Sequence, residues 1–84
     1  MDGEAASAVD VRGQAGDEAL ETVVAALDRA TLAGQPLLRI IHGYGTGRLK
    51  AVLRDYLVAS PYAVRFRAGE RSEGGDGVTI VELK

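Results

Sequence analysis

The fold is decided by the stretch Leu37-Leu38-Arg39-Ile40-Ile41-His42-Gly43-Tyr44-Gly45-Thr46-Gly47. Its first five residues form a brief, largely apolar run, which is typical of an interior strand. Glycines then alternate with other residues and lead into the apolar spacing of a helix. The stretch therefore predicts a strand, a glycine-rich loop and a helix in immediate succession.

On the N-terminal side of this stretch, alternating apolar and polar residues predict a short strand over 9–12, with Val9 and Val11 on the core face. A helix should follow, with an N-cap at Asp17 and a left-handed stop at Gly34, because apolar residues recur there at helical spacing. These residues are Leu20, Val23, Val24, Leu27 and Ala30. A helix between two parallel strands forms a right-handed β-α-β unit.

On the C-terminal side, Thr46 is the predicted N-cap of a second helix that Ser60-Pro61 ends. Alternation over 62–67 predicts a third strand with one apolar and one cationic face. The glycine-rich segment 68–77 predicts a turn or mobile loop before a last strand over 78–83. The apolar face of the third strand would hold Tyr62, Val64 and Phe66, and its cationic face Arg65 and Arg67.

The element order β-α-β-α-β-β predicts an α/β fold, a two-layer sandwich with a mixed four-stranded sheet. Residues 1–8 have no periodicity and are expected to form a flexible lead-in, followed by a single domain over residues 9–84. No apolar run approaches the roughly 20 residues of a membrane span, so no membrane partner is expected and a cytoplasmic location is predicted. The chain has no cysteine and one histidine, which do not supply a conventional zinc site.

The charged residues are distributed unevenly, although the net charge is only −2. Residues 1–35 contain two basic and seven acidic side chains, whereas residues 36–71 contain seven basic and two acidic ones. This asymmetry would suit a local phosphate-binding face, and it would equally suit solvated helix and strand surfaces.

Three polar side chains follow the first two predicted strands and could meet at one crevice. Asp10 and Arg12 end the first strand and His42 ends the second. In α/β sheets the ligand crevice lies beyond the carboxyl ends of parallel strands. His42 is suited to moving a proton, Arg12 to holding a phosphate, and Asp10 to orienting either of them. The alternative is a strand-end turn at His42 and an ordinary ion pair between Asp10 and Arg12.

The loop after His42 is a candidate anion site. Its glycines allow close backbone approach, and it opens onto a helix N-terminus, where free amides attract phosphate. It lacks the spacing of Walker A and dinucleotide-binding loops, and a simple tight turn would use the same residues. The candidate nucleic-acid contacts are Gly43, Tyr44, Gly45, Thr46, Gly47, Arg48, Lys50, Arg65 and Arg67.

The combination of motifs resembles the Smr (small MutS-related) domain. Val9-Asp10-Val11-Arg12-Gly13 resembles the family's opening Leu-Asp-Leu-His/Arg-Gly motif, and residues 42–47 resemble its His-Gly-x-Gly-x-Gly signature. A third block, over residues 73–79, resembles the glycine-rich segment before the family's last strand. The resemblance implies a fold similar to the C-terminal domain of translation initiation factor three. It also implies endonuclease activity, with Asp10, Arg12 and His42 in the proposed catalytic positions.

Two departures from the family pattern affect this expectation. Arg12 stands where many RNA-cleaving members have histidine, and this arginine form resembles the domain attached to the diverged bacterial MutS paralogue, an ATPase linked to recombination control or stalled ribosomes. Tyr44 stands where lysine or arginine is frequent, so its ring either stacks on bases or packs on the protein.

The resemblance implies a nucleic-acid partner, with DNA favoured over RNA or the ribosome, and a monomeric domain within a larger chain. The alternative function is non-catalytic docking. The cofactor stays open, because hydrolysis by water often uses Mg²⁺ or Mn²⁺ and a 2′-hydroxyl nucleophile needs neither.

Overall fold

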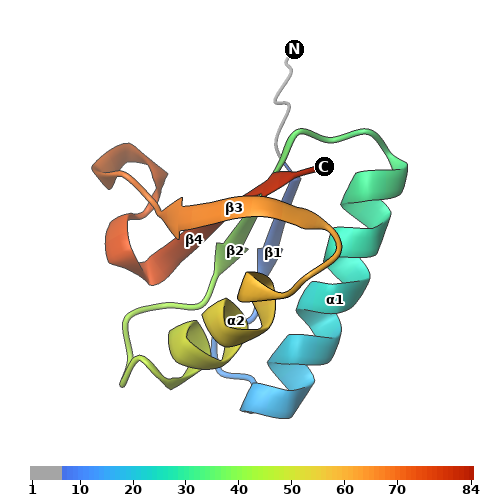
Figure 1. Cartoon of the computed structure of the whole chain (residues 1–84). Helices are drawn as coiled ribbons and strands as arrows, with labels where there is room; N and C mark the ends of the chain where they lie inside the picture. The colour runs from blue at the N-terminus through green and yellow to red at the C-terminus, as the bar shows by residue number, and fades with distance from the viewer. Residues whose placement is uncertain (1–6) are drawn as a thin grey trace.

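The computed structural model describes residues 7–84, in which two helices cover one face of a four-stranded sheet (Figure 1). The predicted two-layer α/β fold and its β-α-β-α-β-β order are confirmed. Two 3₁₀ turns, η1 (Arg71–Glu73) and η2 (Gly75–Gly77), lie between the last two strands. The elements are β1 (Ser7–Asp10), α1 (Gly16–Leu32), β2 (Leu37–Ile41), α2 (Arg48–Val58), β3 (Ala63–Ala68) and β4 (Val78–Leu83).

The strand order in the sheet is β1-β2-β4-β3. β1 and β2 are adjacent and parallel, with Asp10 in register with Ile41, as the β-α-β unit requires. β4 is antiparallel to both of its neighbours and enters the middle of the sheet. As a result, the carboxyl ends of β1 and β2 and the start of β4 lie at the same edge.

The core lies between the helices and one face of the sheet. Along β2, Leu38 and Ile40 are buried against the helices, whereas Leu37, Arg39 and Ile41 alternate onto the helix-free face. Full burial of a side chain such as Leu38 contributes about 1.5–3 kcal/mol to folding. The helices, the other strands and the β1–α1 loop supply further fully buried residues, among them Val11, Ala19, Val23, Leu27, Leu53 and Val81.

The N-terminal strand begins and ends earlier than predicted. It covers Ser7–Asp10 rather than 9–12, so Ser7 and Ala8, expected in the lead-in, are paired with β2. The rest of that lead-in lies outside the described residues. Pairing continues one step past the strand, because the Val11 amide donates to the Ile41 carbonyl at 2.9 Å. Val11 is fully buried, in agreement with its predicted core position.

Both predicted N-caps are displaced by one or two residues. The N-cap of α1 is Ala15, and Asp17 lies in the first turn, where a carboxylate is favoured by the helix dipole. The N-cap of α2 is Gly47, whose φ of 83° is left-handed. Thr46 still accepts a bond from the Arg48 amide, at 3.4 Å. The predicted stop of α1 is correct, since Gly34 has a φ of 73°.

The prediction that Val64 shares the core face with Phe66 is wrong. The register of β3 against β4 shifts between Ala63 and Arg65, as in a β-bulge, which breaks the alternation of side chains. Val64 is 50% exposed, whereas Ala63 and Phe66 pack against the core. Tyr62 also packs there, but it precedes the strand.

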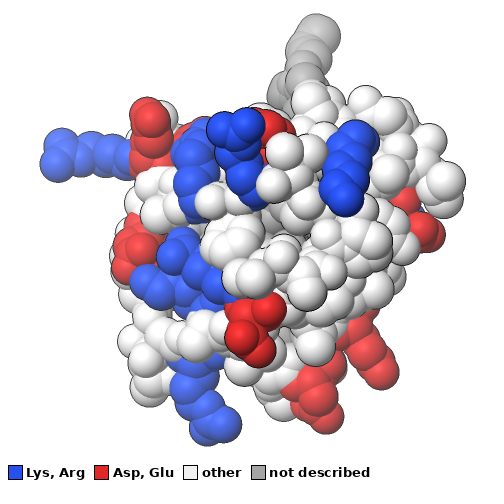
Figure 2. All heavy atoms as spheres, viewed as in Figure 1, with Lys and Arg blue, Asp and Glu red and all other residues white. Residues whose placement is uncertain are grey.

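The charge asymmetry of the sequence appears on the surface. In Figure 2 acidic side chains gather over the first half of α1, whereas basic ones gather over α2 and β3, with acidic neighbours among them. Acidic and basic side chains are therefore concentrated in different parts of the molecule, although several basic side chains have acidic partners nearby. No helix within residues 7–84 is long and apolar enough to cross a membrane.

Candidate nucleic-acid site

A groove of about 420 Å³ opens where β1 and β2 end. One wall is the β1–α1 loop, with residues 13–16, and the other is the β2–α2 loop, with residues 42–47. The first turn of α2 closes one end. Figure 1 shows both loops at the lower end of the sheet. The crevice expected beyond the carboxyl ends of the parallel strands is therefore present.

The β2–α2 loop has a backbone that requires glycine. Gly43 and Gly47 have φ values of 80° and 83°, which residues with a Cβ rarely adopt. The first hydrogen bond of α2 runs from the Ala51 amide to the Gly47 carbonyl at 3.0 Å, so the amides of Leu49 and Lys50 have no partner within the helix. These two residues line the groove. Such a helix start is suited to an anion.

Arg12 and Asp10 form a pair beside the groove. The guanidinium of Arg12 donates from Nε at 2.9 Å and from Nη2 at 2.6 Å to the two carboxylate oxygens of Asp10. This side-chain contact and a bond from the Arg12 amide lower the pKa of Asp10 to about 2. The Arg12 stem covers Gly43, where a Cβ would lie 3.3 Å from Arg12 Cγ. Arg12 is thus held next to the loop, and its guanidinium is exposed.

His42 is buried, with only 5% of its surface exposed. Its Nδ1 lies 3.0 Å from the Gly43 carbonyl and its Nε2 lies 2.9 Å from the Thr79 hydroxyl. Because the carbonyl only accepts, Nδ1 carries the proton in this arrangement, and Nε2 of the neutral ring accepts from Thr79. Burial is the main cause that lowers the pKa of His42, and the positive charges of Arg54 and Lys50 add to it.

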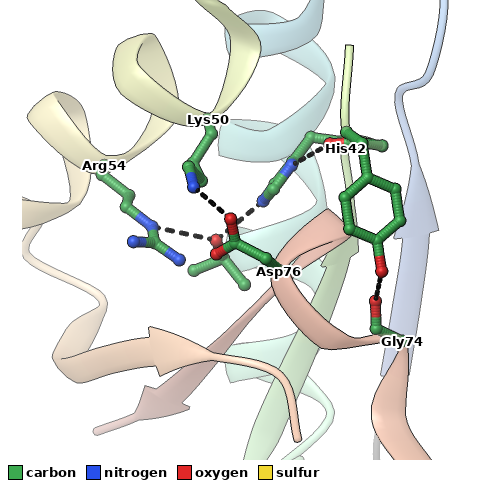
Figure 3. A network of polar contacts seen from close by, with 8 residues as sticks. His42, Lys50, Arg54, Gly74 and Asp76 are labelled. Carbon is green, nitrogen blue, oxygen red and sulfur yellow. Dashed lines mark hydrogen bonds and ion pairs between the residues drawn. The ribbon is translucent and has the colours of Figure 1, made fainter. Parts of the chain in front are cut away.

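Thr79 connects His42 to α2. The Arg54 Nε donates to the Thr79 hydroxyl at 3.2 Å, and Lys50 forms a 2.7 Å ion pair with Asp76 (Figure 3). This cluster, comprising His42, Thr79, Arg54, Lys50 and Asp76, links α2 to the turn before β4. We call it the polar cluster. Two of its members, His42 and Lys50, also line the groove.

The structure does not bring His42 into contact with Asp10 or Arg12. Asp10 is in register with Ile41, so both point to the helix-free face. His42 is the next residue after Ile41, and its ring points to the helix side, where it contacts Thr79. The sheet edge therefore separates the predicted proton carrier from the predicted phosphate-binding pair. A ligand common to both would therefore have to contact Arg12 on one side of Gly43 and His42 on the other.

The Tyr44 side chain packs against glycines of the protein but stays largely exposed to solvent. Its hydroxyl donates to the Gly74 carbonyl at 3.0 Å, and its ring lies so close to Gly77 that a Cβ there would be 3.0 Å from Tyr44 Cε2. The side chain is still 68% exposed and lines the groove. The contact with glycines fixes the ring, while part of the ring surface faces solvent.

The segment predicted as a turn or mobile loop is an ordered pair of 3₁₀ turns. Glu73 and Glu70 form a capping box, and Glu73 accepts a 2.8 Å bond from Arg67. Hydrogen bonds to Glu73 lower its pKa to about 2, and the bond from the Arg67 side chain contributes more than the bond from the Glu70 amide. The amides of His42 and Gly43 both donate to the Gly77 carbonyl. This segment is therefore part of the groove's support.

Arg65 and Arg67 lie on the helix-free face, away from the groove. Arg65 Nε is 3.3 Å from the Glu82 carboxylate, and Arg67 pairs with Glu73. Each predicted phosphate contact on this face is thus next to a glutamate. Arg39, which the sequence did not single out, shares this face.

The described residues do not fit a resident metal ion. Within residues 7–84, no three His, Asp or Glu side chains lie together as a metal site requires. The carboxylates of Asp10 and Asp76 are already engaged beside the groove, Asp10 by Arg12 and Asp76 by Lys50.

Lowering the pH should destabilise the fold through His42. In the unfolded chain its pKa returns to about 6.5, above the folded value, so the unfolded state binds more protons as the pH falls. The free energy of unfolding, measured in urea between about pH 5.5 and 8, should therefore decrease below pH 6.5. Because His42 is the single histidine, His42→Gln should remove this dependence. An unchanged slope in that variant would contradict the assignment.

Known proteins are similar to this chain in both sequence and fold. The family model of the Smr domain matches residues 9–84. A relative from Anaeromyxobacter sp., named Endonuclease MutS2, is 53% identical over 76 residues, covering 90% of this chain and 9% of the relative. One of the same name from Clostridium botulinum is 47% identical over 78 residues, covering 93% and 10%. The chain thus spans about a tenth of the length of these relatives.

Two crystal structures have the same architecture. The Smr domain of Thermus thermophilus MutS2 superposes with a TM-score of 0.90 at 40% identity, covering 93% of this chain and 98% of that one. YdaL, a stand-alone small MutS-related protein from Escherichia coli, has a TM-score of 0.79 at 21% identity, covering 93% and 64%, which supports the fold alone. With the matched family model and these relatives, the chain belongs to the Smr domain family.

Proposed function

We propose that this domain is an endonuclease that binds a phosphodiester backbone in the groove and cleaves it with little sequence specificity, most simply as a DNA-nicking activity in recombination control in the cytoplasm. Relatives of the same family are named endonucleases, which supports cleavage. The observation that carries the proposal is the glycine-lined groove, with free α2 amides at one end and Arg12 beside Gly43. Backbone amides and arginine contact phosphates without reading sequence.

The candidate residues take different roles in this proposal. The β2–α2 loop and the start of α2 hold one phosphate, and Arg12 neutralises the charge that develops on it during cleavage. Asp10 keeps the Arg12 guanidinium in place through two bonds. His42 moves the proton, for which its ring must exchange the Thr79 bond for substrate. Its lowered pKa leaves the ring neutral, and able to accept a proton, at neutral pH.

A second function is favoured by the burial of His42. Both of its ring nitrogens have protein partners and the ring is 5% exposed, as in a residue that supports a loop. If His42 only supports the loop, the domain would dock on branched nucleic acid or on stalled ribosomes without cleaving nucleic acid. The groove and its basic rim would serve this role equally well.

Nicking of a supercoiled plasmid separates the two functions. The 84-residue chain should convert the plasmid to open circles, and labelled DNA and RNA of one sequence should identify the substrate. Parallel reactions with Mg²⁺, Mn²⁺ and a chelator establish the metal requirement. Binding of these substrates without cleavage in any reaction would reject the endonuclease and leave the docking function.

The salt dependence of binding should identify the residues that bind phosphate. Arg12→Ala with Arg48→Ala should flatten the plot of log affinity against log salt by about 0.9 for each phosphate that the variant no longer neutralises. Arg29→Ala, which removes one exposed arginine at the end of α1, controls for the loss of a single positive charge, so slope changes are compared per charge removed. Fluorescence anisotropy on a labelled duplex gives the slopes.

The helix-free face needs its own variant, because Arg65→Ala alone would leave Glu82 unpaired. Arg65→Ala with Glu82→Ala removes both charges and keeps the net charge. We expect a smaller change in slope than in the groove variant, because this face lies away from the groove. An equal or larger change would place the main binding surface on this face.

A further inference from the structure

We infer that Tyr44 is a specificity-determining residue that stacks on an unpaired base and so directs this domain to single-stranded or locally opened nucleic acid. The inference rests on the proposed function, because it requires a phosphate in the groove. It adds the class of substrate that the same site selects. Three features of Tyr44 carry it: its exposure, its fixed orientation and its position inside the phosphate-binding loop.

The exposure of Tyr44 is unusual for a ring that is also packed. Large aromatic side chains normally bury most of their surface, yet Tyr44 is 68% exposed. The groove is lined by the same side chain. An exposed ring surface at the wall of a groove is available to another flat, apolar group.

The orientation of the ring is set by the glycines before β4. A Cβ on Gly77 would lie 3.0, 3.2 and 3.3 Å from three atoms of the ring, so only glycine leaves room for it. The hydroxyl is bound to the Gly74 carbonyl, and a Cβ on Gly75 would lie 3.0 Å from that hydroxyl. A ring held in this way loses little conformational entropy when a base stacks on it.

The position of the ring is inside the proposed phosphate-binding loop. Tyr44 lies between Gly43 and Gly45 in the loop that opens onto α2. A nucleotide whose phosphate occupied the loop would have its base within reach of the ring. Bases inside a duplex are already paired and stacked on both faces, so they cannot use the ring. Sequence-tolerant stacking on aromatic side chains is typical of single-strand binding.

The test compares three labelled probes with equal numbers of phosphates: an oligothymidylate, an abasic strand and a blunt duplex. Tyr44→Ala should weaken binding of the oligothymidylate by roughly five- to hundredfold and leave the other two affinities unchanged. Tyr44→Phe keeps the ring but removes the bond to the Gly74 carbonyl, so it should lose much less affinity for the oligothymidylate than Tyr44→Ala. Gly77→Ala should displace the ring and reproduce the loss, with urea unfolding to check that the fold is retained.

A tryptophan at the same position gives a direct signal. The chain has no tryptophan, so Tyr44→Trp introduces a single reporter whose fluorescence should be quenched by the oligothymidylate and not by the abasic strand. Equal losses on all three probes in Tyr44→Ala, or no loss on any, would overturn the inference while leaving phosphate binding in place. Failure of the unmodified chain to bind any probe would instead overturn the proposed function, and the inference with it.

Discussion

His42→Asn and His42→Gln are both expected to slow phosphodiester cleavage by about 10²–10⁴-fold while changing nucleic-acid affinity by less than about twofold. Neither amide takes up a proton near neutral pH, so proton transfer is lost in both. Each still forms part of the local bonding: the shorter amide can donate to the Gly43 carbonyl, and the longer one can reach the Thr79 hydroxyl. Single-turnover cleavage and anisotropy measure the two effects separately.

Thr79→Val is the control that distinguishes proton transfer from support of the loop. It removes the hydroxyl between His42 and Arg54 and leaves the imidazole in place. If His42 acts as the proton carrier, this variant should keep cleavage within about tenfold of the original rate. Equal losses in Thr79→Val and in the His42 variants would show that the polar cluster only positions the loop. Unchanged cleavage in the His42 variants would remove the ring from the mechanism.

The fold was largely predictable because its elements have strong local patterns. The largely apolar run 37–41, the helical spacing after Asp17 and the glycine stop at Gly34 all agree with the structure. The errors occur where tertiary packing overrides a local pattern. Val64 leaves the core because β3 changes register against β4, and that register depends on a pairing that the sequence alone does not reveal.

The arrangement of the candidate site was predictable only in part, for the same reason. Asp10, Arg12 and the loop after His42 follow from strand ends and glycines, which are local features. The polar cluster depends on β4 entering between β2 and β3, which brings Thr79 to His42 across 37 positions of sequence. Thr79, Arg54 and Asp76 carried no motif that a local pattern could identify. The resemblance of residues 73–79 to a family block was the one signal that this segment matters.

Arg12→Ala is expected to lower kcat/KM for cleavage by about 10²–10³-fold, the usual effect of removing one donor to a developing negative charge. Arg12→Lys keeps the charge but cannot form the two-pronged hydrogen bond with Asp10, so an intermediate loss is expected. Asp10→Asn keeps an acceptor for the guanidinium and should have the smallest effect. A loss confined to KM in all three variants would indicate that Arg12 only binds the substrate.

Arg12→His tests whether the positive charge itself is required. A solvent-exposed imidazole is mostly neutral above its pKa of about 6.5, so cleavage should be low at neutral pH and recover as the pH falls. The recovery has a lower limit, because His42 must stay neutral to accept a proton. Burial lowers the pKa of His42, so a pH interval exists in which the introduced imidazole is charged and His42 is not. A rate maximum in that interval would support both roles at once, and a rate that falls steadily with pH would contradict the role of the Arg12 charge.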